Sequence, residues 1–307
     1  MPVPVTVVTG FLGSGKTTLV NRWLGDFARG EVAVIVNELG AVGIDGALLA
    51  ARAETLVEIA GGCVCCATRA DLVRALDALA TSAAPPKRIL VETSGAASPA
   101  GVLHAIRGSA RAGAHALDGV VTIVDATRVA SLAEHELAIE QLGYADVIVL
   151  SRADLVDTIR ARDWVHGHNG AAVVVAAARG AVEGASLATL LERRTEEWPA
   201  PAPTTPHVYE SVSLTHDGEV DGDRFADFME SEVARFGGRI FRTKGILAIE
   251  GVPEKMIVQG VADEVEVTFG AGWGETRRTS RFVVVGYGLD RDALARAFAA
   301  CAVVRSS

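Results

Sequence analysis

Residues 3–17 read Val3-Pro4-Val5-Thr6-Val7-Val8-Thr9-Gly10-Phe11-Leu12-Gly13-Ser14-Gly15-Lys16-Thr17. The first seven are mostly apolar and β-branched, which predicts a buried strand. The last eight have the spacing of a phosphate-binding loop, Gly-x4-Gly-Lys-Thr. Glycines let backbone N–H groups face the phosphates, and the next helix adds its positive end. We expect a bound nucleotide here; a chance glycine-rich turn is the alternative.

The loop predicts roles for individual side chains. Lys16 would reach the β- and γ-phosphates, Thr17 would ligate Mg²⁺, and Thr18 would touch the α-phosphate. The expected nucleotide-binding residues of this loop are Gly10, Gly13, Ser14, Gly15, Lys16, Thr17 and Thr18.

Short β-branched runs alternate with helical patterns from residue 1 to about 198. Near-continuous apolar strands separated by helices predict a parallel sheet covered on both faces, an α/β fold. Ligands of such sheets gather at the carboxyl ends of the strands. The expected strands are Val3–Thr9, Val32–Asn37, Thr55–Ala60, Arg88–Glu92, Gly119–Asp125, Asp146–Leu150 and Ala172–Ala177, with helices such as Arg69–Leu79 and Glu134–Gly143.

Two further segments follow strands directly. Glu92 can hold Mg²⁺ through water, and the amide of Gly95 can sense a γ-phosphate, unless Glu92 is merely a strand-terminating acid. Residues 151–154, Ser-Arg-Ala-Asp, occupy the place of the guanine-reading motif Asn-Lys-x-Asp. Asp154 matches the aspartate of this motif, whereas Ser151 stands in the place of its asparagine, whose side-chain amide would contact the base. The alternative is a solvated loop without base specificity.

Cys63, Cys65 and Cys66 lie within four residues. Three thiolates could bind Zn²⁺ and leave the fourth position for a carboxylate, an imidazole or water. The alternatives are a buried cysteine group and a redox pair. Cys301 is expected in a core.

The prolines of residues 199–206 predict a semi-rigid linker. After it we expect a small α+β domain of the ferredoxin-like type. The predicted domains are thus residues 1–198 and 207–307. The second contains strands Val208–Leu214, Arg239–Glu250, Met256–Val261 and Arg281–Tyr287 and helices Asp223–Phe236 and Asp290–Cys301.

The composition excludes some partners. A formal charge of −9 argues against a surface that tracks phosphate backbones, so we expect no nucleic acid. No apolar run is long enough to span a bilayer, and the N-terminus lacks the features of a signal peptide. We therefore expect a cytoplasmic protein without a membrane partner.

Taken together, these motifs resemble the CobW-like GTPases, a family with zinc metallochaperones and nitrile hydratase activators. The resemblance covers nearly the whole chain. It rests on Gly10–Leu19, Val36–Gly40, Gly62–Cys66, Glu92–Gly95, Val124–Ala126, Gln141–Asp146 and Asp154, and in the second domain on Arg242–Gly245, Gln259–Val261, Trp273 and Arg281.

The resemblance implies a slow GTPase whose nucleotide state controls metal binding and delivery to a client metalloprotein. Lys16, Thr17 and Glu92 would be catalytic, with Mg²⁺ at Thr17 and Glu92. Zinc or another soft divalent ion would bind the three cysteines, with Glu38 or water completing the site.

The chain departs from the family pattern in two places. Ala41 stands where the family's switch segment has a second glutamate, and residues 199–206 replace a histidine-rich tract. Both departures reduce the supply of metal ligands. A nucleotide-dependent thiol redox switch is the alternative function, a P-loop kinase is a third, and a homo-oligomer is possible.

Overall fold

The computed structural model describes residues 2–28, 30–38, 55–60, 66–110, 113–182, 185–187, 189–191, 209–261 and 264–303. The chain forms two compact units, Met1–Val165 with Ala172–Trp198, and His166–Ala171 with Pro199–Ser307. The short segment His166–Ala171 therefore groups with the second unit, although the predicted domain of residues 1–198 contains it. The predicted linker, residues 199–206, lies outside the described residues, so the domain limits stay a prediction.

The described residues of the first unit form one eight-stranded sheet. Its strands are β1 (Val3–Thr9), β2 (Val32–Glu38), β3 (Thr55–Ala60), β4 (Arg88–Thr93), β5 (His115–Asp125), β6 (Val147–Ser151), β7 (Val173–Ala178) and β8 (Ala181–Val182). They are ordered β3-β2-β4-β1-β5-β6-β7-β8, and each neighbouring pair is parallel except β7 and β8. The predicted parallel sheet is confirmed.

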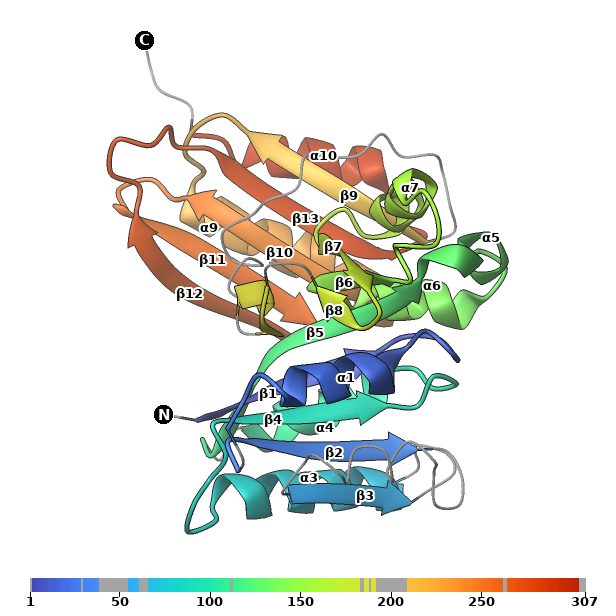
Figure 1. The fold of residues 1–307 in the computed structure, drawn as a ribbon. Helices are drawn as coiled ribbons and strands as arrows, with labels where there is room; N and C mark the ends of the chain where they lie inside the picture. The colour runs from blue at the N-terminus through green and yellow to red at the C-terminus, as the bar shows by residue number, and fades with distance from the viewer. Residues whose placement is uncertain are drawn as a thin grey trace. The chain divides into compact units, whose positions relative to one another are not determined.

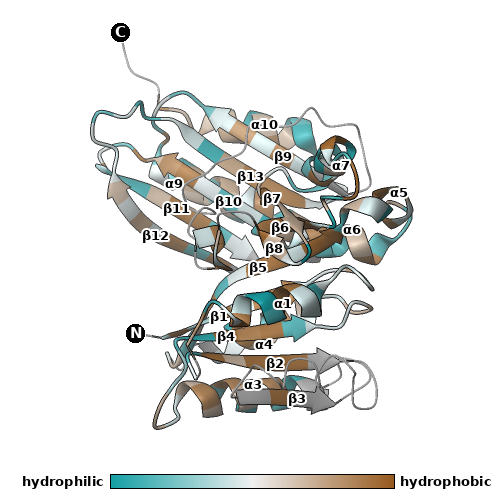
Figure 2. Ribbon diagram, in the orientation of Figure 1, coloured by the Kyte–Doolittle hydropathy of each residue, from teal (hydrophilic) through white to brown (hydrophobic). Residues whose placement is uncertain are grey.

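Helices cover both faces of this sheet (Figure 1). Val147 and Val149 of β6 pack in one core with the first helix, whereas Ile148 and Leu150 pack in another with helices of the opposite face. Because both faces of β6 are buried, its residues Val147–Leu150 are all hydrophobic (Figure 2). The helices are α1 (Lys16–Leu24), α3 (Cys66–Ala80), α4 (Ala100–Ala110), η1 (Ala126–Arg128), α5 (Val129–Leu132), α6 (Glu136–Gly143) and α7 (Ile159–His168).

The second unit is an antiparallel sheet with helices on one face. Its elements are β9 (Tyr209–His216), α9 (Gly222–Phe228), η2 (Met229–Val233), η3 (Ala234–Arg239), β10 (Ile240–Ala248), β11 (Glu254–Val261), β12 (Glu264–Gly272), β13 (Ser280–Tyr287) and α10 (Arg291–Ala300). The strand order is β12-β11-β10-β13-β9. Because β9 and β10 are both antiparallel to β13, β9-α9-β10 is a split β-α-β unit, as in ferredoxin-like modules. Here, however, the second helix follows the last strand.

Phenylalanines fill the core between the helices and this sheet. Phe225 lies edge-on to Phe282, with ring centroids 5.4 Å apart, and Phe228 lies edge-on to Phe298 at 5.8 Å. Such edge-to-face pairs add to the stabilisation from burial. Cys301 is buried in the same core, as predicted.

The sequence-based prediction missed β8 and β12. Val265, Val267 and Phe269 of β12 alternate with polar residues, the spacing of a strand, and all three are exposed; β12 is an edge strand of the sheet. The predicted helix Asp223–Phe236 consists of α9, a π-helical segment and a 3-10 segment. Among the described residues, no helix is both long and apolar enough to cross a membrane.

Candidate functional site

The phosphate-binding loop follows β1 directly, and its glycines adopt conformations that other residues avoid. Gly10, Gly13 and Gly15 have φ values of 141°, 74° and 95°. A Cβ on Gly10 would lie only 2.2 Å from the carbonyl oxygen of Ile123. Helix α1 begins at Lys16 without a side-chain cap, so its first amides point into the loop. The loop is thus built as a backbone cradle for an anion.

Ser14 gives an independent test of whether a phosphate fits this cradle. Its side chain is buried, and its hydroxyl has no hydrogen-bond partner among the described residues. A buried hydroxyl without a partner costs stability unless a ligand satisfies it. A phosphate oxygen of a bound nucleotide would supply that partner, so the residues present fit the group.

The structure brings Lys16, Thr17 and Glu92 together. Lys16 Nζ donates to the carbonyl of Gly10 at 2.8 Å and to that of Phe11 at 3.3 Å. The Thr17 hydroxyl donates to Glu92 Oε1 at 2.9 Å. Glu92 is buried at the carboxyl end of β4, beside β1. The Mg²⁺ role of Thr17 and Glu92 stays a prediction, but a metal ion held by both needs this proximity.

Gly95 packs directly against the phosphate-binding loop. A Cβ there would lie 2.8 Å from the amide nitrogen of Leu12 and 2.9 Å from Lys16 Nζ. The buried side chain of Gln141 donates to the carbonyl of Ala97 at 3.0 Å and to that of Gly95 at 3.5 Å. The sequence analysis did not assign this role to Gln141, although Gln141 begins the segment Gln141–Asp146 on which the family resemblance partly rests.

A cavity of about 140 Å³ lies beside the loop. It is lined by Ser14, Gly15, Thr18, Leu19, Ile123, Val149, Ser151, Arg152, Ala177, Arg179 and Gly180. Since one water occupies about 30 Å³, the cavity is too large for a single solvent molecule. Its place, beside the phosphate cradle and between the ends of β5, β6 and β7, suits a nucleoside.

The segment predicted to read guanine lies at this cavity, but its side chains differ in role. The Ser151 hydroxyl faces the carbonyls of Ser14 at 2.7 Å and Val124 at 3.3 Å, so it braces the phosphate-binding loop. Arg152 has φ 54° and forms an ion pair with buried Asp125. Asp154 is not among the lining residues; its Oδ2 lies 4.0 Å from Nε of Arg179.

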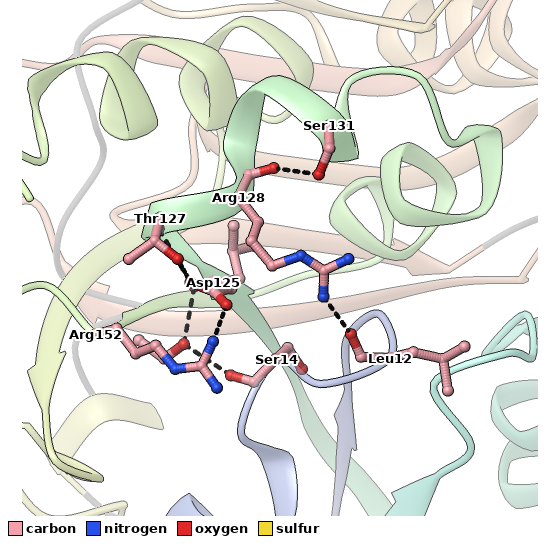
Figure 3. Close-up of polar contacts among 9 residues, drawn as sticks. Leu12, Ser14, Asp125, Thr127, Arg128, Ser131 and Arg152 are labelled. Atoms are coloured by element: carbon pink, nitrogen blue, oxygen red, sulfur yellow. Dashed lines mark hydrogen bonds and ion pairs between the residues drawn. The ribbon is translucent and has the colours of Figure 1, made fainter. Parts of the chain in front are cut away.

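The segment after β5 contacts both sides of the site (Figure 3). Asp125 accepts from the amide and hydroxyl of Thr127 at 3.0 and 2.6 Å, in addition to its pair with Arg152. Arg128 donates to the carbonyl of Leu12 at 3.1 Å. Sequence reasoning singled out neither arginine contact, because residues 12, 125 and 152 are far apart in the chain.

The predicted metal site falls mainly outside the described residues. This holds for Cys63 and Cys65, and for the side chains of Cys66, which begins α3, and Glu38, which ends β2. The backbone pairs Glu38 with Ala60, the last residue of β3 before the cysteine segment. Within the part of the chain that the structure describes, no group of three His, Cys, Asp or Glu side chains is placed to hold a metal ion.

Comparisons with known proteins add to this geometry. Residues 4–174 match the family described as CobW/HypB/UreG, nucleotide-binding domain, and residues 209–302 match the cobalamin synthesis protein cobW C-terminal domain. The chain is 32% identical to the zinc chaperone CobW of Pseudomonas aeruginosa, over 95% of this chain and 90% of the relative. It is 28% identical to the zinc chaperone YjiA of Escherichia coli, over 97% and 98% of the two chains.

Among solved structures, zinc-bound YjiA GTPase from Escherichia coli aligns with a TM-score of 0.75 and 24% identity, over 99% of this chain and 100% of that chain. A likeness at this identity shows a shared fold.

Proposed function

This chain belongs to the CobW/HypB/UreG family of nucleotide-binding proteins, and on that premise we propose that it hydrolyses GTP and delivers a divalent metal ion, zinc in the first place, to a client metalloprotein. The observation that carries the proposal is the contact between Thr17 and Glu92 beneath the phosphate-binding loop. It joins the phosphate-binding loop to β4, and β2 connects β4 with β3, the strand that precedes the cysteine segment.

In the transfer of the γ-phosphoryl group to water, each of the residues around the phosphate-binding loop would have a different contact with the nucleotide or its Mg²⁺ ion. Lys16, now bonded to loop carbonyls, would turn to the β- and γ-phosphates and neutralise charge there. Thr17 and Glu92 would hold Mg²⁺, Glu92 through a water, and the ion would balance the charge that develops on the phosphate oxygens. The amide of Gly95 would face the γ-phosphate, because its backbone approaches Lys16 closely.

Neighbouring strands support a link between this site and a metal cargo. Asn37 of β2 is paired with Thr93 of β4, and Glu38 is paired with Ala60 of β3. The carboxyl ends of β4, β2 and β3 therefore lie side by side. Cys63, Cys65 and Cys66 would supply thiolates and Glu38 a fourth ligand for Zn²⁺.

The test is zinc binding by chelator competition with reduced thiols, together with GTP and ATP turnover. Replacing Cys63, Cys65 and Cys66 with serine should remove high-affinity zinc binding and leave GTP binding intact. Cys301→Ser is the matched control, since a serine hydroxyl can replace the contact of the buried thiol with the carbonyl of Ala297. The Cys301→Ser variant should bind zinc with the affinity of the wild type. In a separate measurement, Lys16→Ala should abolish GTP turnover.

Other outcomes would contradict parts of the proposal. Stoichiometric zinc binding by the triple variant would sink the thiol assignment. Equal turnover of ATP and GTP by the wild type would sink the guanine assignment. Reversible disulfide formation in a protein that binds no zinc would favour the redox switch.

A further inference from the structure

In the guanine-reading segment, Arg152 lines the cavity but its guanidinium is paired with buried Asp125, which leaves Ser151 and Asp154 to meet the base. The edge of guanine presents hydrogens at N1 and at the 2-amino group and an acceptor at O6. A carboxylate such as Asp154 only accepts, so it can serve N1 and the amino group but not O6. The single hydrogen of the Ser151 hydroxyl faces the carbonyls of Ser14 and Val124. Neither of these two side chains therefore offers O6 a donor, so a side chain outside the segment has to be considered.

Arg179 is such a donor, at the mouth of the same cavity. A guanidinium carries five N–H donors and no acceptor. Arg179 lines the cavity, its side chain is 93% exposed, and its Nε lies 4.0 Å from Oδ2 of Asp154. An exposed side chain can turn toward a bound base without breaking a packed core.

The backbone around Arg179 holds this donor beside Asp154. Arg179 has φ 50° and is followed by Gly180 with φ 77°. A Cβ on Gly180 would lie 3.0 Å from the methyl group of Thr18, so the turn packs closely on α1. The amide of Ala153 donates to the carbonyl of Ala177 at 3.1 Å, which ties the segment of Asp154 to the strand end before Arg179.

We propose that Arg179 reads O6 of guanine and that Arg179 and Asp154 together determine base specificity; this inference rests on the proposed use of GTP. Selectivity for guanine over adenine would follow from the positions of the acceptor, Asp154, and the donor, Arg179, along the edge of the base. Adenine presents an acceptor at N1 and an amine at C6, the reverse pattern. It would place an acceptor against the Asp154 carboxylate and a donor against the Arg179 guanidinium, and leave both unpaired.

The test is the affinity of the full chain for GDP, ADP and 6-thio-GDP, in which a sulfur, a poor acceptor, replaces O6. Arg179→Ala should weaken GDP binding by about tenfold, the loss of one charge-assisted hydrogen bond, and should change ADP binding little. Wild type should bind 6-thio-GDP about tenfold more weakly than GDP, whereas Arg179→Ala should bind the two alike. Arg179→Lys, which keeps a charged donor, should restore part of the preference for GDP.

Arg160→Ala is the control for the loss of one positive charge, since Arg160 is exposed on α7. The ratio of GDP to ADP affinity in this variant should equal that of the wild type.

Equal loss of GDP and ADP affinity in Arg179→Ala would mean that the arginine covers the face of any purine, and would overturn the inference. Unchanged GDP preference in Arg179→Ala would overturn it too, and would leave the GTPase proposal standing. Equal affinity of the wild type for GDP and ADP would overturn both.

Discussion

At the scale of single residues, Glu92 of β4 connects the central sheet with the phosphate-binding loop and the start of α1. It is 75 positions from Thr17 in sequence, yet the two side chains are hydrogen-bonded at 2.9 Å. The carboxylate is buried near the carboxyl end of β4, where the Thr17 hydroxyl donates to it. A Mg²⁺-binding carboxylate and a strand-terminating acid are the two predicted roles of this side chain, and a single substitution distinguishes them.

Glu92→Gln should therefore reduce Mg²⁺-dependent GTP turnover. The amide keeps the size of the side chain but loses the charge that would hold the ion through water. Loss of such a partner costs about 10- to 100-fold in metal affinity or activity. Turnover measured across a range of Mg²⁺ concentrations checks this, with Glu31→Gln as the control, because Glu31 pairs with Lys87 at the surface. A turnover rate like that of the wild type at limiting Mg²⁺ would exclude Glu92 from the metal site.

At the scale of elements, the segment that follows β5 joins two parts of the nucleotide site. Asp125 ends β5, caps η1 and pairs with Arg152 after β6, while Arg128 at the end of η1 contacts the phosphate-binding loop. The Phe11 ring also stacks on His135, just before α6, with centroids 4.7 Å apart. The base side and the phosphate side are thus held by the same short stretch of chain.

Asp125→Asn should destabilise the protein. Asparagine keeps the shape, but it loses the charge that assists the bonds to Arg152 and Thr127. Because Arg152 is about half exposed, we expect a modest loss of about 1–2 kcal/mol in the free energy of unfolding. Urea unfolding measures it, with Asp163→Asn on the exposed face of α7 as the control. If the two variants unfold at the same urea concentration as the wild type, the Asp125 network contributes no stability.

The buried side chain of His115, the first residue of β5, lies close to α3 and α4, at the amino end of the strand and away from the nucleotide site. His115 Nε2 lies 2.9 Å from the Ser109 hydroxyl, and Nδ1 lies 3.6 Å from Oδ1 of Asp77. Burial lowers the pKa of His115 below 6.5, and the charge of Asp77 and a backbone hydrogen bond of Ile106 only partly oppose this. At pH 6.5 and above, the native state therefore keeps this imidazole mainly neutral.

This pKa predicts a loss of stability in acid. Below pH 6.5 the unfolded chain takes up the proton before folded His115 does, so the free energy of unfolding falls as the pH drops toward the folded pKa. Urea unfolding at pH 7.5 and pH 5 should show a smaller decrease for His115→Gln than for the wild type. His104→Gln, at an exposed position of α4, should keep the decrease of the wild type. An identical decrease in all three proteins would refute this role of His115.

At the scale of the whole molecule, nucleotide and metal should bind as one linked system. The carboxyl ends of β1, β4, β2 and β3 are neighbours in the sheet, so ordering residues around a γ-phosphate can shift Glu38. If GTP changes zinc affinity, zinc must change GTP affinity by the same factor.

Zinc affinity should therefore differ by about five- to 150-fold between the GDP form and the form with a non-hydrolysable GTP analogue. Since Ala41 cannot bind a metal ion, Glu38→Ala should remove most of this difference while the thiols still bind zinc. Glu31→Ala, just before the other end of β2, should leave it unchanged. Chelator competition in both nucleotide states measures it. Equal zinc affinities in the two states of the wild type would mean a metal-binding GTPase without a switch.

The sequence alone determined the parallel sheet and the phosphate-binding loop. Both depend on local patterns: apolar runs of strand length separated by helical spacing, and glycines at the positions where the loop has positive φ. The same patterns placed Glu92 and Ser151 at strand ends and Thr17 at the start of the helix that follows the loop. The spacing of Val265, Val267 and Phe269 also carried a strand signal for β12, which the prediction missed, whereas the exposure of these side chains became known only from the structure.

Only the tertiary structure decided which of these strand ends meet. Strand order is not encoded in periodicity, yet it determines that Glu92 reaches Thr17 and that Asp125 reaches Arg152. Arg179 gave no sequence signal, because its approach to Asp154 depends on the turn between β7 and β8. The family resemblance had assigned Thr17 and Glu92 to the same Mg²⁺ ion, whereas the contacts of Asp125 with Arg152 and of Arg179 with Asp154 were not predicted. These contacts depend on how whole strands and turns pack, and local sequence patterns do not encode that packing.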